Sequence, residues 1–218
     1  MTAMYTNVIY IFTTLAFASI YVRGTDRLPN EETSIDRDKQ YETNQDIHRA
    51  MNISSILWLL GFNYVSPHTA NKSCVYLSIS SLTPDCVKYS SNFIKYNNCK
   101  GRIDYAGMFY NSPYVTNGKK EEPVHYSNLR AWAGNWIMNY TLIYSDYEEC
   151  LLFRVPNMHN GTGCMILVTD LEKGMSSTCE ATFNKVCGMS HNIWKVPGTN
   201  CKDRHKQITE TCDLTAGK

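Results

Sequence analysis

The chain has 218 residues and nearly balanced charge, with 21 Lys plus Arg against 20 Asp plus Glu. This length is sufficient for one good-sized domain. The balance excludes a strong overall field of the kind that attracts nucleic acid or an anionic membrane, so we expect neither as a partner. Nine cysteines and fifteen tyrosines are the compositional features that stand out.

The amino terminus carries an apolar run, Val8 to Ile20, that is short for a bilayer span but suits a signal-peptide core. Ala16-Phe17-Ala18 offers a cleavage site, and Gly24 marks a second end. We therefore predict a signal peptide over residues 1–24, with 18 as the alternative end. Residues 25–218 then form one secreted domain.

The next segment, residues 35–51, is mostly polar with Ile47, Ala50 and Met51 as apolar contacts, which predicts a short helix. From Ile53 onward, short apolar or alternating runs are separated by turn residues. Eight strands are predicted, at residues 53–65, 74–80, 87–96, 102–110, 114–116, 136–144, 150–155 and 164–169. Their succession predicts an all-β fold, an eight-stranded antiparallel meander closed into a barrel.

After the strands, STCEATFNKVCG predicts a helix over residues 177–188. Ser177 would cap its start, Glu180 would complete a capping box, and Gly188 would end it. One face of this helix gathers Cys179, Phe183, Val186 and Cys187. The remaining residues predict a polar tail that carries Cys201 and Cys212.

In a secreted domain, nine cysteines indicate about four disulfides and one unpaired thiol. The chain has no C-x-x-C pair, so no structural metal is expected. Bonds from Cys150 to Cys179 and from Cys164 to Cys187 would pin the helix to the barrel wall, each worth roughly 3–4 kcal/mol. Four sequons predict glycosylation, at Asn52, Asn71, Asn139 and Asn160.

No motif for nucleophilic, metal-dependent or nucleotide chemistry occurs in a suitable context, so we expect no enzyme and no cofactor. The aromatic residues of the strands are more informative. An eight-stranded barrel either fills itself with side chains or holds one small ligand. The aromatics could be simple core, but their polar tips favour a ligand pocket. The candidates are Trp58, Tyr64, Tyr105, Phe109, Trp136 and Tyr140.

The stretch from Tyr144 to Gly188, which begins YSDYEECLLFRV, resembles the tick salivary lipocalins of the histamine-binding type. Three further segments are similar to that family: ILWLLGFNYV, the Lys72-Ser73-Cys74-Val75 tetrapeptide, and the tail Thr209 to Cys212. The resemblance implies an extracellular, monomeric eight-stranded lipocalin barrel with a short amino-terminal helix and a carboxyl-terminal helix on its wall. It also implies sequestration of small host mediators, which evades the host's inflammatory defence during blood feeding.

The resemblance further implies a set of disulfides. The pairs are Cys74–Cys212, Cys150–Cys179 and, as in many members, Cys164–Cys187. A bond between Cys86 and Cys99 on neighbouring strands is plausible, which leaves Cys201 as the odd thiol.

The ligand positions depart from the amine-binding members, in which acidic residues hold the cation. Uncharged residues stand at the three corresponding places, Tyr140, Leu151 and the strand from Met165 to Leu167. The expected ligand contacts are Tyr64, Trp136, Met138, Tyr140, Leu151 and Met165, with Asp104 as the remaining acid inside the barrel.

Three ligand hypotheses follow from this. Family membership favours a biogenic amine such as histamine or serotonin. The residues themselves favour a lipid mediator, such as a leukotriene or another fatty-acid derivative. In the third hypothesis, the barrel is a scaffold whose loops bind a host protein such as complement or a coagulation factor.

Overall fold

The computed structural model describes residues 35–64, 70–116, 119–188, 194–196 and 198–212. The predicted signal peptide lies outside these residues. In place of one helix over residues 35–51, the chain forms two 3-10 helices and one α-helix: η1 (Ile35–Arg37), η2 (Lys39–Asn44) and α1 (Ile47–Met51). Two aspartates cause the division, because Asp38 caps η2 and Asp46 caps α1 through their side chains.

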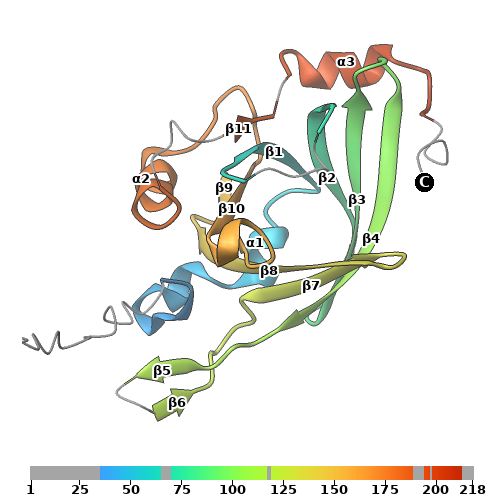
Figure 1. The fold of residues 1–218 in the computed structure, drawn as a ribbon. Coiled ribbons are helices and arrows are strands. Elements are labelled where there is room, and N and C mark those ends of the chain that lie inside the picture. The colour runs from blue at the N-terminus through green and yellow to red at the C-terminus, as the bar shows by residue number, and fades with distance from the viewer. Residues whose placement is uncertain (1–34, 65–69, 117–118, 189–193, 197, 213–218) are drawn as a thin grey trace, which may run out of the picture. The chain divides into compact units, whose positions relative to one another are not determined.

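Eight antiparallel strands form a closed barrel (Figure 1). Closure comes from the pairing of the first strand with β10, and a short additional strand, β11 (Trp194–Lys195), joins the first strand beside it. The barrel strands are β1 (Ile56–Phe62), β2 (Lys72–Leu82), β3 (Cys86–Lys95), β4 (Lys100–Tyr110), β7 (Asn128–Ala133), β8 (Trp136–Ser145), β9 (Cys150–Val155) and β10 (Gly163–Val168).

The predicted number of barrel strands is confirmed, but one of the predicted strands lies outside the barrel wall. Residues 114–116 form β5 (Tyr114–Thr116), which pairs only with β6 (Lys119–Glu121) in a separate hairpin. The place between β4 and β8 belongs to β7, whose Leu129 and Ala131 alternate into the core. Three residues are too few to cross the barrel wall, whereas β7 pairs along its full length with β8.

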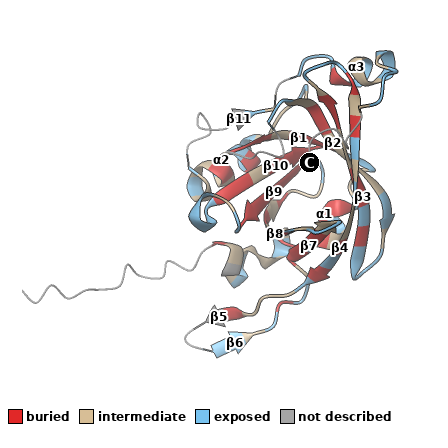
Figure 2. Cartoon of the chain, turned by 45° about the vertical axis from the view of Figure 1, so that its right-hand side comes forward, coloured by how far each residue is buried: buried red, intermediate tan, exposed pale blue. Residues whose placement is uncertain are grey.

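Strands β9 and β10 are buried on both faces (Figure 2). Inward side chains such as Phe153 join the barrel interior, while outward ones such as Leu152 join a second apolar cluster outside the wall. Helix α2 (Ser177–Val186) provides the cover, packing its fully buried Phe183 against this outer cluster. The predicted helix on the barrel wall is therefore present.

Polar groups at both ends of α2 position it. Ser176, not the predicted Ser177, is the N-cap, and its hydroxyl accepts a hydrogen bond from the Cys179 N–H. At the other end, the buried guanidinium of Arg154 donates to the carbonyl of Val186 at 3.2 Å. The guanidinium also faces the Asp36 carboxylate at 3.8 Å, which ties η1 to the same site.

The disulfides include both predicted bonds on α2, Cys150–Cys179 and Cys164–Cys187. The other predicted pairs, Cys74–Cys212 and Cys86–Cys99, were wrong. The structure joins Cys74 to Cys201 and Cys99 to Cys212, and it leaves Cys86, not Cys201, unpaired and exposed.

The carboxyl-terminal segment explains the exchange of partners. It contains a helix that the sequence analysis missed, α3 (Cys201–Gln207), which places Cys201 beside Cys74. Thr211 then bridges Lys100, so Cys212 lies beside Cys99. Cys86 and Cys99 flank opposite ends of the ten-residue strand β3, roughly 30 Å apart, too far for a bond.

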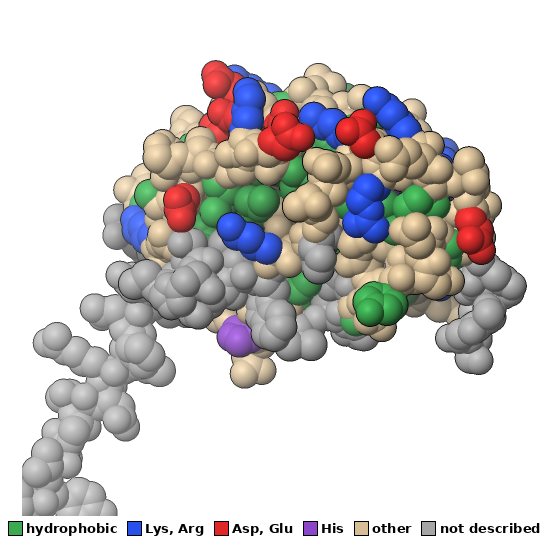
Figure 3. All heavy atoms as spheres, turned by 90° about the horizontal axis from the view of Figure 1, so that it is seen from above, with side chains coloured by type: hydrophobic (Ala, Val, Ile, Leu, Met, Phe, Trp, Pro, Cys, Tyr) green, Lys and Arg blue, Asp and Glu red, His purple; other side chains and the backbone are tan. Residues whose placement is uncertain are grey.

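The surface carries both charge signs. Figure 3 shows acidic and basic side chains interspersed on one face, with hydrophobic side chains between them. No helix among the described residues is long and apolar enough to cross a membrane. Of the sequon asparagines, Asn52, Asn71 and Asn160 are exposed and Asn139 is half-buried on β8. Their glycosylation stays a prediction.

We expect non-reducing peptide mapping of the oxidised protein to recover linked peptides for Cys74–Cys201 and Cys99–Cys212. A maleimide should label Cys86 alone without prior reduction, because its thiol is exposed and unpaired. Recovery of a Cys74–Cys212 peptide would contradict the position of α3.

Truncation of Phe183 should destabilise the domain because it removes the centre of the α2 contact. For Phe183→Ala we expect the free energy of unfolding to fall by about 3–5 kcal/mol in urea titrations with the disulfides intact. The exposed Thr178 on the same helix provides the control, and Thr178→Ala should change stability by less than about 0.5 kcal/mol. Equal effects of the two substitutions would show that α2 is not packed on the wall.

Candidate functional site: a cavity inside the barrel

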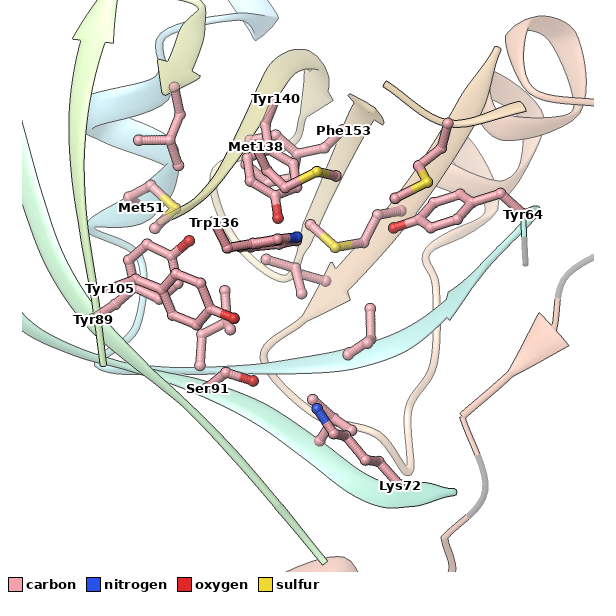
Figure 4. Close-up of a pocket in the computed structure, with 17 residues that line it drawn as sticks. Met51, Tyr64, Lys72, Tyr89, Ser91, Tyr105, Trp136, Met138, Tyr140 and Phe153 are labelled. Carbon is pink, nitrogen blue, oxygen red and sulfur yellow. The ribbon is translucent and has the colours of Figure 1, made fainter. Parts of the chain in front are cut away.

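The barrel encloses a cavity of about 90 Å³, room for about three water molecules at the volume each occupies in the liquid (Figure 4). All eight barrel strands contribute to its lining, together with α1 and the segments that follow β1 and β9. Most lining side chains are aliphatic, aromatic or methionine. A mainly apolar cavity with a few polar groups is the usual form of a small-molecule site.

One end of the cavity is closed by α1. Ile47, Ala50 and Met51 are buried there, and Met51 reaches the cavity lining. The opposite end is bounded by the half-buried Lys72 and Met158, so these residues form its rim.

Aromatic rings form one wall of the cavity. Tyr89 and Tyr105 stack with ring centroids 5.1 Å apart and planes inclined by 11°, and Trp136 meets Tyr105 edge-on at 5.8 Å. Tyr140 contacts Phe153 in a second edge-on pair at 6.3 Å. These pairs fix the orientation of the rings, so the wall can receive a flat ligand without rearranging.

Four tyrosine hydroxyls are available to a ligand. Tyr64, Tyr89, Tyr105 and Tyr140 line the cavity, and none has a hydrogen-bond partner among the described residues. The hydroxyls of Tyr64 and Tyr140 point into the space between the labelled side chains (Figure 4). Burial raises the pKa of all four phenols, so they stay protonated and can donate.

Five of the seven predicted ligand residues line this cavity: Tyr64, Trp136, Met138, Tyr140 and Met165. Leu151 does face inward, but it is fully buried in the packed part of the interior and does not reach the cavity. The prediction of Asp104 as an acid inside the barrel was wrong. Its side chain is 72% exposed on the outer face, where it accepts hydrogen bonds from Ser90 and Arg102.

Three further aromatics were expected inside the barrel. Tyr105 lines the cavity, and Phe109 packs in the interior without reaching it. Trp58 points outward into the second cluster, where it contacts Tyr76 and His205 of α3. Its position follows from the alternation of β1, because Leu57 and Leu59 take the interior face.

The sequence analysis missed several lining residues, including Met51, Tyr89, Met158 and Lys72. Tyr89 could have been found, since it alternates with the inward Val87. Lys72 could not, because Val75 and Leu77 also face inward and regular alternation would place Lys72 outside. An irregularity in the β2–β3 register between Ser73 and Tyr76 reverses the alternation of inward and outward side chains, so Lys72 faces the cavity.

The cavity lining carries few charged side chains. Among the described lining residues Lys72 is the one charged side chain, and no carboxylate accompanies it. No cluster of His, Cys, Asp and Glu able to hold a metal occurs in the described ranges. The arrangement can therefore enclose an apolar or aromatic molecule and offer it hydroxyl donors and one ammonium.

Comparison with solved structures finds the same architecture. Apocrustacyanin C1 superimposes with a TM-score of 0.53 at 17% identity, covering 79% of this chain and 92% of its own. Apocrustacyanin C2 gives 0.51 at 15% identity, with 77% and 88% covered. Japanin from Rhipicephalus appendiculatus, solved with cholesterol bound, gives 0.42 at 21% identity, with 68% and 95% covered. The likeness to the two apocrustacyanins identifies the fold as that of the lipocalins.

A search of curated proteins finds no match to the sequence. The family model for the tick histamine binding protein, in contrast, matches residues 35–203, which include all eight barrel strands and α2. Both this family and the lipocalin fold are those of ligand-binding carriers, and four disulfides fit an extracellular protein. The chain therefore belongs to the tick histamine-binding protein family.

Proposed function

We propose that this protein is secreted in saliva and captures a small host mediator inside its barrel, which withdraws that mediator from the inflammatory response at the feeding site. The observation that carries the proposal is the cavity itself, with buried tyrosine hydroxyls that have no partner among the described residues. Family membership and the extracellular character of a four-disulfide domain support it.

A biogenic amine such as histamine or serotonin is the mediator that family membership favours. The stacked Tyr89 and Tyr105 and the nearby Trp136 offer aromatic faces, which attract cations. A buried ammonium, however, needs a carboxylate to offset its desolvation, and the described lining supplies none. The residues of the cavity thus weigh against a protonated ligand.

A lipid mediator, such as a fatty-acid derivative, is the second candidate and fits the lining better. Four leucines, four methionines and Phe153 line the cavity and would cover an apolar body. Because the cavity holds only about 90 Å³, a long acyl chain would extend past the rim at Lys72 and Met158.

The first test is calorimetric titration of the disulfide-intact protein with histamine, serotonin and a fatty-acid mediator, with tryptophan fluorescence recorded in parallel. Trp136 lines the cavity, so an occupant should quench part of the emission. We expect saturable one-to-one binding of at least one of these molecules. Absence of binding by all three would overturn the proposal of small-mediator capture.

The second test removes one of the unpartnered hydroxyls. We expect Tyr140→Phe to lower the affinity for the tightest-binding of these three molecules by about three- to tenfold, because one hydrogen bond is lost. Stability should change by less than about 1 kcal/mol, since the hydroxyl bonds to no described residue. The control is Tyr144→Phe, at a tyrosine that packs outside the barrel wall and should leave affinity unchanged.

A further inference from the structure

The charge of the cavity resides on a single side chain. Lys72 is the first residue of β2 and lines the cavity at its rim, where it is the one charged residue of the described lining. The register irregularity at Ser73 turns it inward, out of step with the rest of the strand. A lysine placed this way differs from the many that are solvated on the outer face.

Aromatic contact holds the ammonium in place. Lys72 Nζ lies 4.0 Å from the centroid of the fully buried Phe93 ring. The same ring lies against the backbone of β4, where a Cβ at Gly101 would come within 2.2 Å of it. Glycine at position 101 therefore makes room for the ring, and the ring in turn supports the lysine.

The ammonium has no counter-ion in the described structure. No carboxylate of the described residues lies within ion-pair distance of Lys72, and its partner across the β2–β3 ladder is a second cation, Lys95. Burial, with the field of Lys95 added, lowers the pKa of Lys72 to about 8. An anion arriving at the rim would supply the missing charge, whereas a cation would be repelled.

We propose that the cavity selects carboxylic acids, namely a molecule with an aromatic or short apolar body whose carboxylate pairs with the Lys72 ammonium. This assignment rests on the proposed capture of a small mediator and adds the chemical class of the ligand. The body lies against the aromatic wall of Tyr89, Tyr105 and Trp136. The protonated hydroxyls of Tyr64 and Tyr140 donate further hydrogen bonds.

The test uses one ring system with three head groups, namely indole-3-acetate, the neutral alcohol tryptophol and the amine tryptamine. In calorimetric titrations we expect the acid to bind about tenfold or more tightly than the alcohol, and the amine to bind most weakly. Laurate paired with dodecanol forms a second arm and shows whether aromatic or acyl acids are preferred. An amine that binds as tightly as its acid overturns the assignment.

Substitution then locates the effect. We expect Lys72→Met to weaken the binding of indole-3-acetate about tenfold or more, and to change the affinity for tryptophol by less than about twofold. The unchanged affinity for tryptophol also demonstrates that the cavity is intact. The matched control is Lys88→Met, at an exposed lysine of β3 outside the barrel, which should change neither. Equal losses for acid and alcohol in Lys72→Met would assign Lys72 a purely structural role and overturn the proposal.

The affinity for the acid should also depend on pH. Between about pH 6.5 and about pH 9.5 the carboxylate stays ionised while Lys72 loses its proton, so affinity should fall as the pH rises through about 8. Lys95 is the charged group that acts on Lys72, and the apolar ring of Phe93 lies against the Lys72 ammonium. Lys95→Met should therefore shift the fall to higher pH, and a flat profile would contradict the ion pair.

Failure of this assignment can be told apart from failure of the proposed function. If the neutral and amine ligands bind without any preference for the acid, small-molecule capture stands and the role of Lys72 is withdrawn. If none of the indole or acyl compounds, nor the mediators named above, binds, both proposals fail together.

Discussion

The antiparallel pairing of β1 with β10 is the constraint on which the site depends. It joins Trp58 to Val168 at one end and Phe62 to Met165 at the other, with a register shift between Leu59 and Gly61. Without this pairing the sheet would have two free edges and no interior. With it, every second residue of eight strands faces a common space, and side chains separated by nearly half of the chain, such as Leu59 and Met165, line one cavity.

An interior that is partly empty loses the packing that a filled core provides. In this protein the compensation lies outside the wall. Helix α2 covers β9 with a second apolar cluster, and the Cys150–Cys179 and Cys164–Cys187 bonds fix the helix to β9 and β10. The carboxyl-terminal bonds from Cys74 and Cys99 act at the other side, near the rim that carries Lys72. The barrel interior thus provides space for a ligand, while the cluster and disulfides outside the wall contribute stability.

The sequence predicted the barrel well, because seven of the eight wall strands carry a clear apolar pattern and end at turn residues. It failed at β7, where a short polar-flanked segment competed with the more aromatic residues 114–116. Two of the four disulfides were predicted, the pair that join α2 to strand starts. The other two depend on α3 and on the bridge between Lys100 and Thr211, which no local pattern indicates.

The errors at the site have an equally physical origin. Asp104 could have been excluded, because Tyr105 and Phe109 were already expected inside and strand alternation places residue 104 on the other face. Lys72 could not have been predicted, since it faces inward only through the register irregularity at Ser73. Sequence periodicity describes regular strands, and the residue that sets the charge of this cavity lies where β2 is irregular.

The unpaired thiol of Cys86 has a practical consequence. It begins β3, whose other end meets Lys72 through Lys95, so roughly 30 Å of strand separate it from the rim. A thiol at this distance is a natural chemical handle. Coupling through Cys86 would anchor the protein to a sensor chip in one orientation, with its binding chamber facing the flowing analyte and no engineered residue required.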